Sequence, residues 1–96
     1  MYTDLDPLLH SQLRLAIISM LVASDKVEFT HIQSETKSAA GNISIQIKKL
    51  EEAGYIKVEK TFKNNYPNTI LSITDQGIKS FESYVSNLKK YISPRK

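Results

Sequence analysis

One segment, residues 36 to 74, constrains the fold of this chain more than any other. Three apolar residues recur in it at i, i+4 and i+7, on one face of an α-helix: Ile43, Ile47 and Leu50. Gly54 follows them, and because it lacks Cβ it can adopt the left-handed conformation that ends a helix. The segment therefore predicts a helix over about 39–53, followed directly by a β-hairpin over about 57–70.

Two helices and a short strand are expected before that segment. Asp6 and the proline after it are typical of a helix start and predict a first helix over 7–23. Val27 to Phe29 form a strand candidate. Thr30, with the glutamine three residues on, matches a capping box and predicts a second helix over 30–36.

The hairpin and the last helix complete the predicted order. Alternation of apolar and polar residues places the hairpin strands at about 55–62 and 69–73. Thr74 caps a final helix over 75–92, and residues 93–96 are expected to fray. The predicted fold is mainly α with a small β-hairpin: one domain over 1–96, with a core of about 5–74.

Composition agrees with one small domain. The chain has 96 residues, of which 41% are hydrophobic, and it has no cysteine. Disulfides, thiolate catalysis and cysteine zinc sites are therefore excluded. No apolar run approaches the ~18 residues of a membrane span, so no membrane partner is expected. We see no export signal and expect a cytoplasmic protein.

The charge is unevenly distributed along the chain. Residues 1–36 carry a formal net charge of −3, whereas residues 37–96 carry +6. Such asymmetry is typical of a protein with a polyanionic partner. A solvated, lysine-rich surface is the plainer alternative.

Nothing in the sequence favours catalysis or a bound cofactor. His10 and His31 lie on separate predicted helices and have no metal-ligand spacing between them. The three glycines, Gly41, Gly54 and Gly77, are scattered, so no phosphate-cradling loop is expected. We therefore expect no enzyme, no metal and no cofactor, and no residue pattern indicates a small-molecule effector.

Two runs of residues resemble a known family. They are LEEAGYIKVEK, from Leu50 to Lys60, and ITDQG, from Ile73 to Gly77. With weaker matches from Leu5 to about Leu88, the chain resembles the small winged helix-turn-helix transcriptional regulators of bacteria and archaea, a MarR/ArsR-like group. The resemblance implies a three-helix core, a wing and a dimeric protein that binds double-stranded DNA, mostly as a repressor.

The chain departs from that family at three places. Relatives usually have Thr or Ser where Ala39 stands, so the recognition helix lacks its usual N-cap unless Ser38 takes over. Ile45 and Gln46 occupy positions where relatives often carry Arg and His. The wing tip, residues 63–68, has no arginine. These differences predict a different target sequence.

The predicted recognition helix and wing supply the residues expected to contact DNA. Asn42 and Gln46 have the amide groups for bidentate adenine contacts, while Ser44 and Ile45 are expected at base edges. Lysines of the helix and wing are expected at phosphates. Plain solvation is the alternative for all of these polar side chains. The full predicted set is Ala40, Gly41, Asn42, Ser44, Ile45, Gln46, Lys48, Lys49, Lys60, Lys63, Asn65 and Tyr66.

The last predicted helix has a heptad pattern of apolar residues, which favours a partner helix alongside. We therefore predict a homodimer. The alternative is that this helix folds back on its own domain. The predicted dimer interface comprises Leu5, Leu8, Leu9, Ile78, Phe81, Tyr84, Val85, Leu88, Tyr91 and Ile92.

A second function class stays open. The weakly charged wing and the apolar Ile45 also suit a winged helix that binds another protein instead of DNA. A contiguous apolar patch on the recognition face would favour that alternative, and a positive face would favour DNA.

Overall fold

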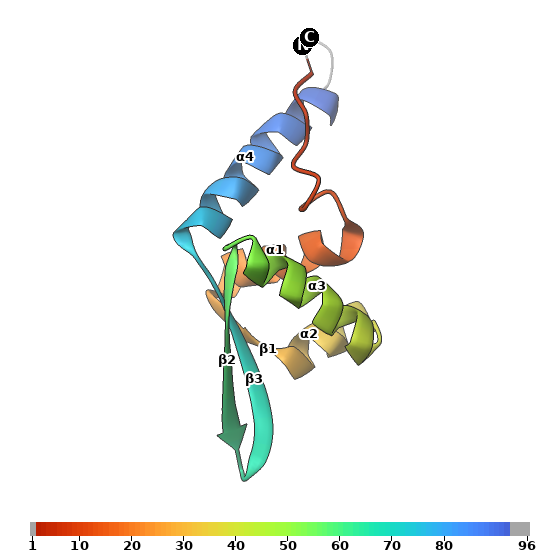
Figure 1. Cartoon of the computed structure of the whole chain (residues 1–96). Coiled ribbons are helices and arrows are strands. Elements are labelled where there is room, and N and C mark those ends of the chain that lie inside the picture. Colours follow the sequence, from red (N-terminus) through yellow and green to blue (C-terminus); the bar gives the residue numbers. More distant parts are fainter. Residues whose placement is uncertain (1, 93–96) are drawn as a thin grey trace.

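The computed structural model describes residues 2–92, which form four helices and a three-stranded sheet (Figure 1). The expected fraying of residues 93–96 lies outside the described residues. The α+β winged-helix fold predicted from the sequence is confirmed. In chain order the elements are α1 (Gln12–Ser24), β1 (Lys26–Glu28), α2 (Phe29–Thr36), α3 (Ala40–Glu52), β2 (Ile56–Lys63), β3 (Tyr66–Ile73) and α4 (Asp75–Ile92).

The three strands form an antiparallel sheet in the order β1-β3-β2. Strands β2 and β3 make a long hairpin that projects beyond the helices (Figure 1). Its turn is Asn64–Asn65, and both residues have positive φ, 52° and 70°. Asparagine tolerates this conformation, which gives a tight two-residue hairpin turn. Strand β3 therefore begins at Tyr66, earlier than the expected residue 69.

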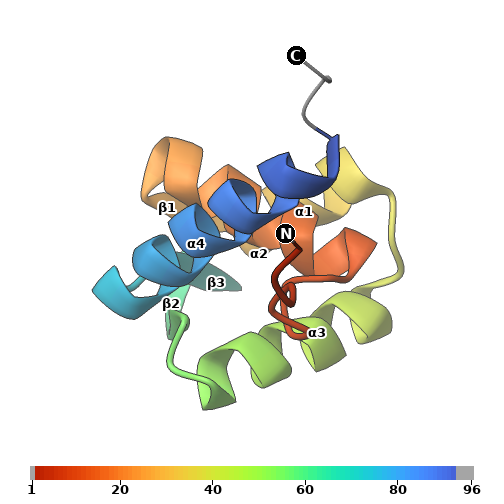
Figure 2. The ribbon, with the colours of Figure 1, turned by 90° about the horizontal axis from the view of Figure 1, so that it is seen from above.

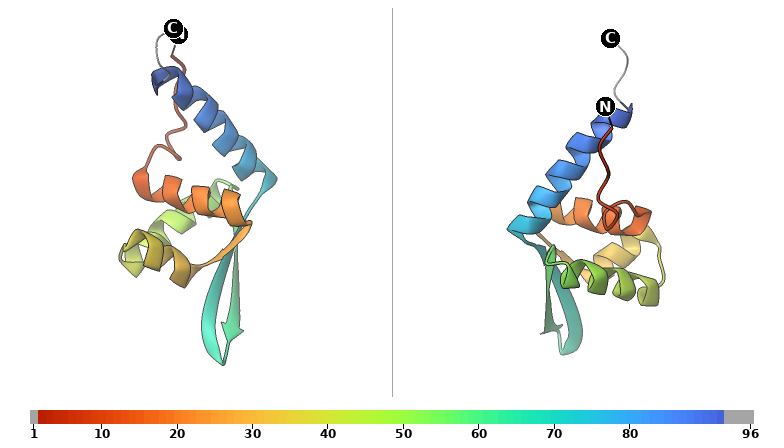
Figure 3. Two further views of the ribbon diagram at one scale, coloured as in Figure 1. Left: turned by 180° about the vertical axis from the view of Figure 1, so that it is seen from behind. Right: turned by 45° about the horizontal axis from the view of Figure 1, so that its top comes forward.

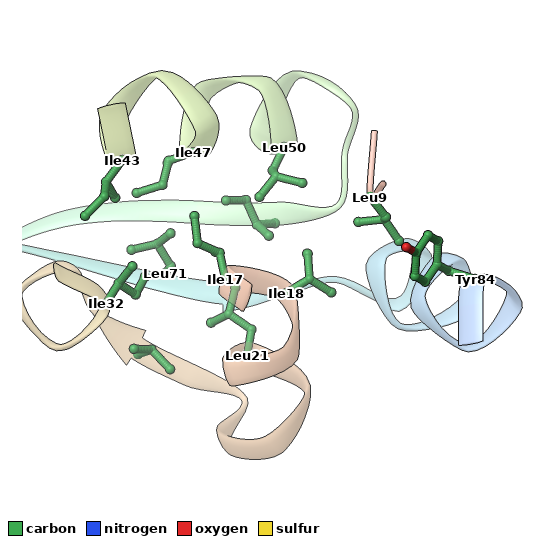
Figure 4. Packing of buried hydrophobic residues seen from close by; sticks show 12 residues of the cluster. Leu9, Ile17, Ile18, Leu21, Ile32, Ile43, Ile47, Leu50, Leu71 and Tyr84 are labelled. Carbon is green, nitrogen blue, oxygen red and sulfur yellow. The ribbon is translucent and has the colours of Figure 1, made fainter. Parts of the chain in front are cut away.

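The apolar face of α3 packs into the core as predicted. Figure 4 shows the side chains of α3 pointing toward those of α1 and the sheet. Burying this much aliphatic surface is the main force that joins the helices to the sheet. The core consists of Leu9, Ile17, Ile18, Leu21, Val27, Ile32, Ile43, Ile47, Leu50, Ile56, Leu71 and Tyr84.

The predicted start of the first helix is wrong. Asp6 does not cap a helix at Pro7; it forms a turn, in which its Oδ1 accepts a hydrogen bond from the backbone N–H of Leu8 at 2.9 Å. Helix α1 begins at Gln12, with Ser11 as its cap. The turn is favoured because it carries Leu9 into the core, where its side chain is fully buried.

The predicted cap of the second helix is also wrong. Helix α2 begins at Phe29, and Glu28, not Thr30, holds the N-cap position without a side-chain cap bond. The Glu28 carboxylate instead accepts hydrogen bonds from Asn68 and Lys63 of the hairpin. At α3, Ala39 holds the N-cap position and offers no side-chain cap, as expected from the sequence.

The junction before α4 is close-packed. Thr74 Oγ1 donates to the carbonyl of Gly54 at 2.7 Å and accepts from the N–H of Gly77 at 3.0 Å. Gly54 has φ of 82°, the left-handed conformation expected after α3. A Cβ at Gly77 would lie 2.2 Å from the carbonyl oxygen of Tyr55, so only glycine fits there. The predicted bounds of α4 are confirmed.

The N-terminal segment runs beside α4, which leans away from the rest of the domain (Figures 1 and 3). The rings of Tyr2 and Tyr91 are 4.8 Å apart, and Thr3 Oγ1 donates to Asn87 Oδ1 at 3.0 Å. Leu9 and Tyr84, both predicted at a dimer interface, lie next to each other in the core of the chain itself (Figure 4). Their assignment to the interface is therefore wrong, because neither side chain is accessible to a partner.

Candidate nucleic-acid interface

Helix α3 forms one edge of the molecule when it is seen from above (Figure 2). Its core residues point inward, so the residues between them on the helical wheel point to solvent. Ile45 lies in the middle of this outward face and is 56% exposed. Among the other predicted α3 residues, Gln46 is half-buried, and the exposed ones are Ala40, Gly41, Asn42, Ser44, Lys48 and Lys49.

A groove separates α3 from the hairpin. Its α3 side is lined by Ser44, Lys48 and Glu51, and its hairpin side by Val58, Lys60 and Thr69. Ile47 and Phe29 are its remaining lining residues. The structure thus brings a lysine of α3 and a lysine of the wing to opposite sides of one groove.

The two faces of the hairpin differ in chemistry, because side chains alternate along a strand. Lys60 and Phe62 lie on the face that contributes to the groove. Lys63 lies on the other face of the hairpin, together with Thr61. The Nζ atom of Lys63 is 3.2 Å from Oε2 of Glu28. The hydrogen bond from Asn68 and then the nearby Lys63 hold the pKa of Glu28 below its ordinary value. Lys63 therefore has an internal partner, unlike a lysine that only faces solvent.

Two aromatic rings project at the wing tip. Tyr66 is 75% exposed, so it does not fold back over the hairpin. Phe62 is 74% exposed, although the sequence analysis gave it no role. Phe62 lies on the same face of β2 as Ile56 and Val58, but the hairpin extends beyond the core at that point. Asn65 is exposed in the turn between the strands.

Arg14 of α1 is the residue that the sequence analysis missed at this site. Its Nε donates to the carbonyl of Leu8 at 2.6 Å, and its guanidinium also donates to Gln46 Oε1. Gln46 Nε2 in turn donates to Asn42 Oδ1 at 2.9 Å. The one available signal was that Arg14 is the only basic residue in α1. Gln46 therefore lies on the flank of α3 that faces α1, and its amide is already bonded.

Residues 2–92 contain no group of three or more His, Asp or Glu side chains that is arranged to hold a metal ion. None of the helices within those residues combines the length and hydrophobicity that a bilayer crossing requires.

The comparisons with known proteins agree with the fold. The family model described as a winged helix DNA-binding domain matches residues 13–92. An uncharacterized protein of Methanocaldococcus jannaschii is 29% identical over 76 residues, which is 79% of this chain and 83% of that protein. Its name assigns it no activity.

Two solved structures are similar over most of both chains. The transcriptional regulator homologue from Pyrococcus horikoshii is 32% identical, with a TM-score of 0.82, and the match covers 88% of this chain and 84% of that one. A putative transcriptional regulator from Thermoplasma acidophilum is 23% identical, with a TM-score of 0.74 and coverage of 90% and 88%. This second likeness shows the fold alone. From the family match, the chain belongs to the family of winged helix DNA-binding domains.

Proposed function

We propose that this protein is a sequence-specific transcriptional regulator that inserts α3 into the major groove of double-stranded DNA. The observation that carries the proposal is the exposed face of α3, which is largely polar, carries two lysines and two glutamates, and shares a groove with Lys60 of the wing. Ala40 and Gly41 at the start of α3 are small and exposed, so they leave room for a close approach to the DNA. An α-helix fits the major groove, whose base edges distinguish all four base pairs.

The wing supplies the second contact. The hairpin extends past α3, so its tip reaches the backbone or minor groove beside the site where α3 binds. Lys48, Lys49 and Lys60 neutralise phosphates, which provides most of the affinity and makes it dependent on salt. The similar Pyrococcus horikoshii protein is a transcriptional regulator homologue, which supports the same role here.

Selection of bound duplexes from a random pool tests this function. We expect one enriched motif, bound with an affinity that falls with salt at a slope of about −0.9 per neutralised phosphate. Lys49→Ala should weaken all duplexes alike, by fluorescence anisotropy. Lys79→Ala, which removes an exposed lysine of α4, is the matched control and should have little effect. Binding that is weak and insensitive to salt would contradict the proposal.

We also propose that the protein acts as a homodimer and a repressor. Support comes from the distal part of α4, where Ile92 is 68% and Tyr91 45% exposed. Val22 and Val85 line an apolar groove between α1 and α4, which a second copy would cover. A twofold dimer would read two half-sites ~34 Å apart. Repression is implied by the resemblance, and a reporter carrying the selected motif tests its sign.

A second candidate function is supported by exposed apolar side chains. Ile45 on α3 and the two aromatic rings of the wing, Phe62 and Tyr66, give the same region an apolar character. A protein partner would bind through these residues. Failure of the random pool to yield any motif, together with retained binding to a protein partner that Ile45→Ser abolishes, would favour this alternative.

A further inference from the structure

A chain of hydrogen bonds runs from the interior of the domain to the exposed first turn of α3. Arg14 is half-buried in α1 and is anchored by the bond from its Nε to the carbonyl of Leu8, at 2.6 Å. Its guanidinium donates to Gln46, and Gln46 donates to Asn42 at 2.9 Å. Asn42 is exposed and lies near the start of α3, where recognition helices contact bases.

The direction of every bond in this chain follows from one residue. A guanidinium has only donors, so the amide oxygen of Gln46 must face Arg14. The NH2 group of Gln46 then faces Asn42, which must turn its own oxygen toward Gln46 to accept that bond. The NH2 group of Asn42 is consequently the part of its amide that points away from Gln46. An isolated surface asparagine would instead sample both orientations.

We propose that Arg14, acting through Gln46, fixes the Asn42 amide with its NH2 group outward, so that Asn42 contacts hydrogen-bond acceptors of DNA. This inference rests on the DNA-binding function proposed above. Bidentate adenine contact needs the amide oxygen as an acceptor, and in Asn42 that oxygen is bonded to Gln46. The fitting acceptors are O6 of guanine, O4 of thymine, N7 of either purine or a phosphate oxygen, and only O6 and O4 distinguish guanine and thymine from adenine and cytosine. Arg14 and Gln46 are thus positioning residues and Asn42 is the contacting residue.

Gln46→Glu is the sharpest test, because it reverses the direction of the hydrogen bond between residue 46 and Asn42 and keeps the length of the side chain at position 46. A carboxylate accepts at both oxygens, so one would bind Arg14 and the other would require Asn42 to donate. The Asn42 amide must then turn over and present its oxygen outward. In the protein without DNA, 15N NMR should show the Asn42 side-chain amide protons shifted by the new bond to a carboxylate. Unchanged Asn42 amide resonances would overturn the inference, whatever the protein binds.

Selection from a random duplex pool tests the consequence for recognition. At one base pair, Gln46→Glu should change the preference from guanine or thymine to a base with an exocyclic NH2 group, adenine or cytosine. The expected change in the preference ratio is roughly tenfold or more. If Asn42 contacts a phosphate instead, the variant should weaken all duplexes alike, and a methylphosphonate at one position should reproduce that loss in the wild type. The changed base preference supports the inference, and a uniform loss supports it when that loss disappears in the Asn42→Ala background.

Asn42→Ala supplies the matched background. The charge added by Gln46→Glu weakens binding to any duplex, and that part of its effect persists when Asn42 is absent. The effect that passes through Asn42 must vanish in the Asn42→Ala background, as a double-mutant cycle measures. An equal effect of Gln46→Glu in both backgrounds would overturn the inference. A wild-type protein that enriches no motif would contradict the proposed function, and the NMR experiment would still test the chain of bonds.

Discussion

The hydroxyl of Tyr55 donates a hydrogen bond of 2.6 Å to Oδ2 of Asp6, across 49 residues of sequence. The bond joins the loop after α3 to the turn that precedes α1. Burial, and then the bond to the Asp6 carboxylate, raise the pKa of the Tyr55 phenol above its ordinary value. The turn at Asp6 is therefore held at both carboxylate oxygens, since Oδ1 accepts from Leu8.

Tyr55→Phe should lower the free energy of unfolding by about 1 kcal/mol at neutral pH, because it removes a hydrogen bond to a charged group at a partly exposed position. A raised phenol pKa means that this contribution is present below the unfolded-state value of about 10 and is lost as the pH rises through the folded-state value. Urea unfolding at pH 7 and above pH 10 measures it. Tyr66→Phe, at the exposed wing tip, is the control; an equal effect of both changes would contradict the prediction.

Substitution by alanine at Gly41 and at Gly77 should change the stability of the protein in opposite directions. At Gly77 a Cβ would meet the carbonyl oxygen of Tyr55 at 2.2 Å, so Gly77→Ala should destabilise the protein by about 1–3 kcal/mol or more. At Gly41 a Cβ meets nothing within 4 Å, and Gly41→Ala should stabilise the helix by roughly 0.5–1 kcal/mol. Thermal unfolding of both variants checks this. A Gly77→Ala protein as stable as wild type would show that α4 does not dock this closely.

The elements that were predicted correctly from the sequence are those determined by residues close together along it. The α3 stripe, the Gly54 stop and the bounds of α4 depend on spacing within one or two turns, and they were predicted correctly. The Asp6–Pro7 pair is equally compatible with a turn and a helix start, and contacts with residues far along the chain select the turn.

The candidate site shows the same limit. Exposure of most α3 residues follows from the helical period, so the outward face was predictable. Arg14 and Gln46 are 32 residues apart, and no local pattern reveals their bond. From the sequence, Lys63 was predicted to contact a DNA phosphate, and the register of the sheet brings it to Glu28.

Glu28 should make the attachment of the hairpin sensitive to acid. Its pKa is lowered by the bond from Asn68 and by Lys63, so its contribution is present above the unfolded-state value of about 4.3 and is lost as the pH falls through the folded-state value. The side-chain amide resonances of Asn68 should therefore titrate in acid, with a midpoint below that value. Glu28→Gln should abolish the titration, whereas Glu59→Gln, at an exposed site on β2, should leave it unchanged. A midpoint at or above the ordinary value would refute the lowered pKa.

The residues of α4 differ in how well they can test the proposed dimer interface. Leu88 and Phe81 of α4 pack against the core of their own chain, so substituting them would disturb the fold together with any interface. Val85 and Ile92 are better probes, because Val85 lines the groove beside Val22 and Ile92 is 68% exposed. Two lysines at these positions would place two charges in an apolar contact between copies, which is strongly unfavourable.

We therefore expect Val85→Lys combined with Ile92→Lys to convert the dimer to a monomer, as measured by light scattering coupled to size exclusion at micromolar concentration. The unfolding temperature measured at low protein concentration, where wild type is also dissociated, should change little, because neither side chain belongs to the core. Ser83→Lys adds a charge at an exposed position on another side of α4 and should leave the dimer intact. A monomeric wild type would contradict the proposed dimer, and the half-sites would then have to be bound by separate copies. A double variant that stays dimeric would show that the copies associate through another surface.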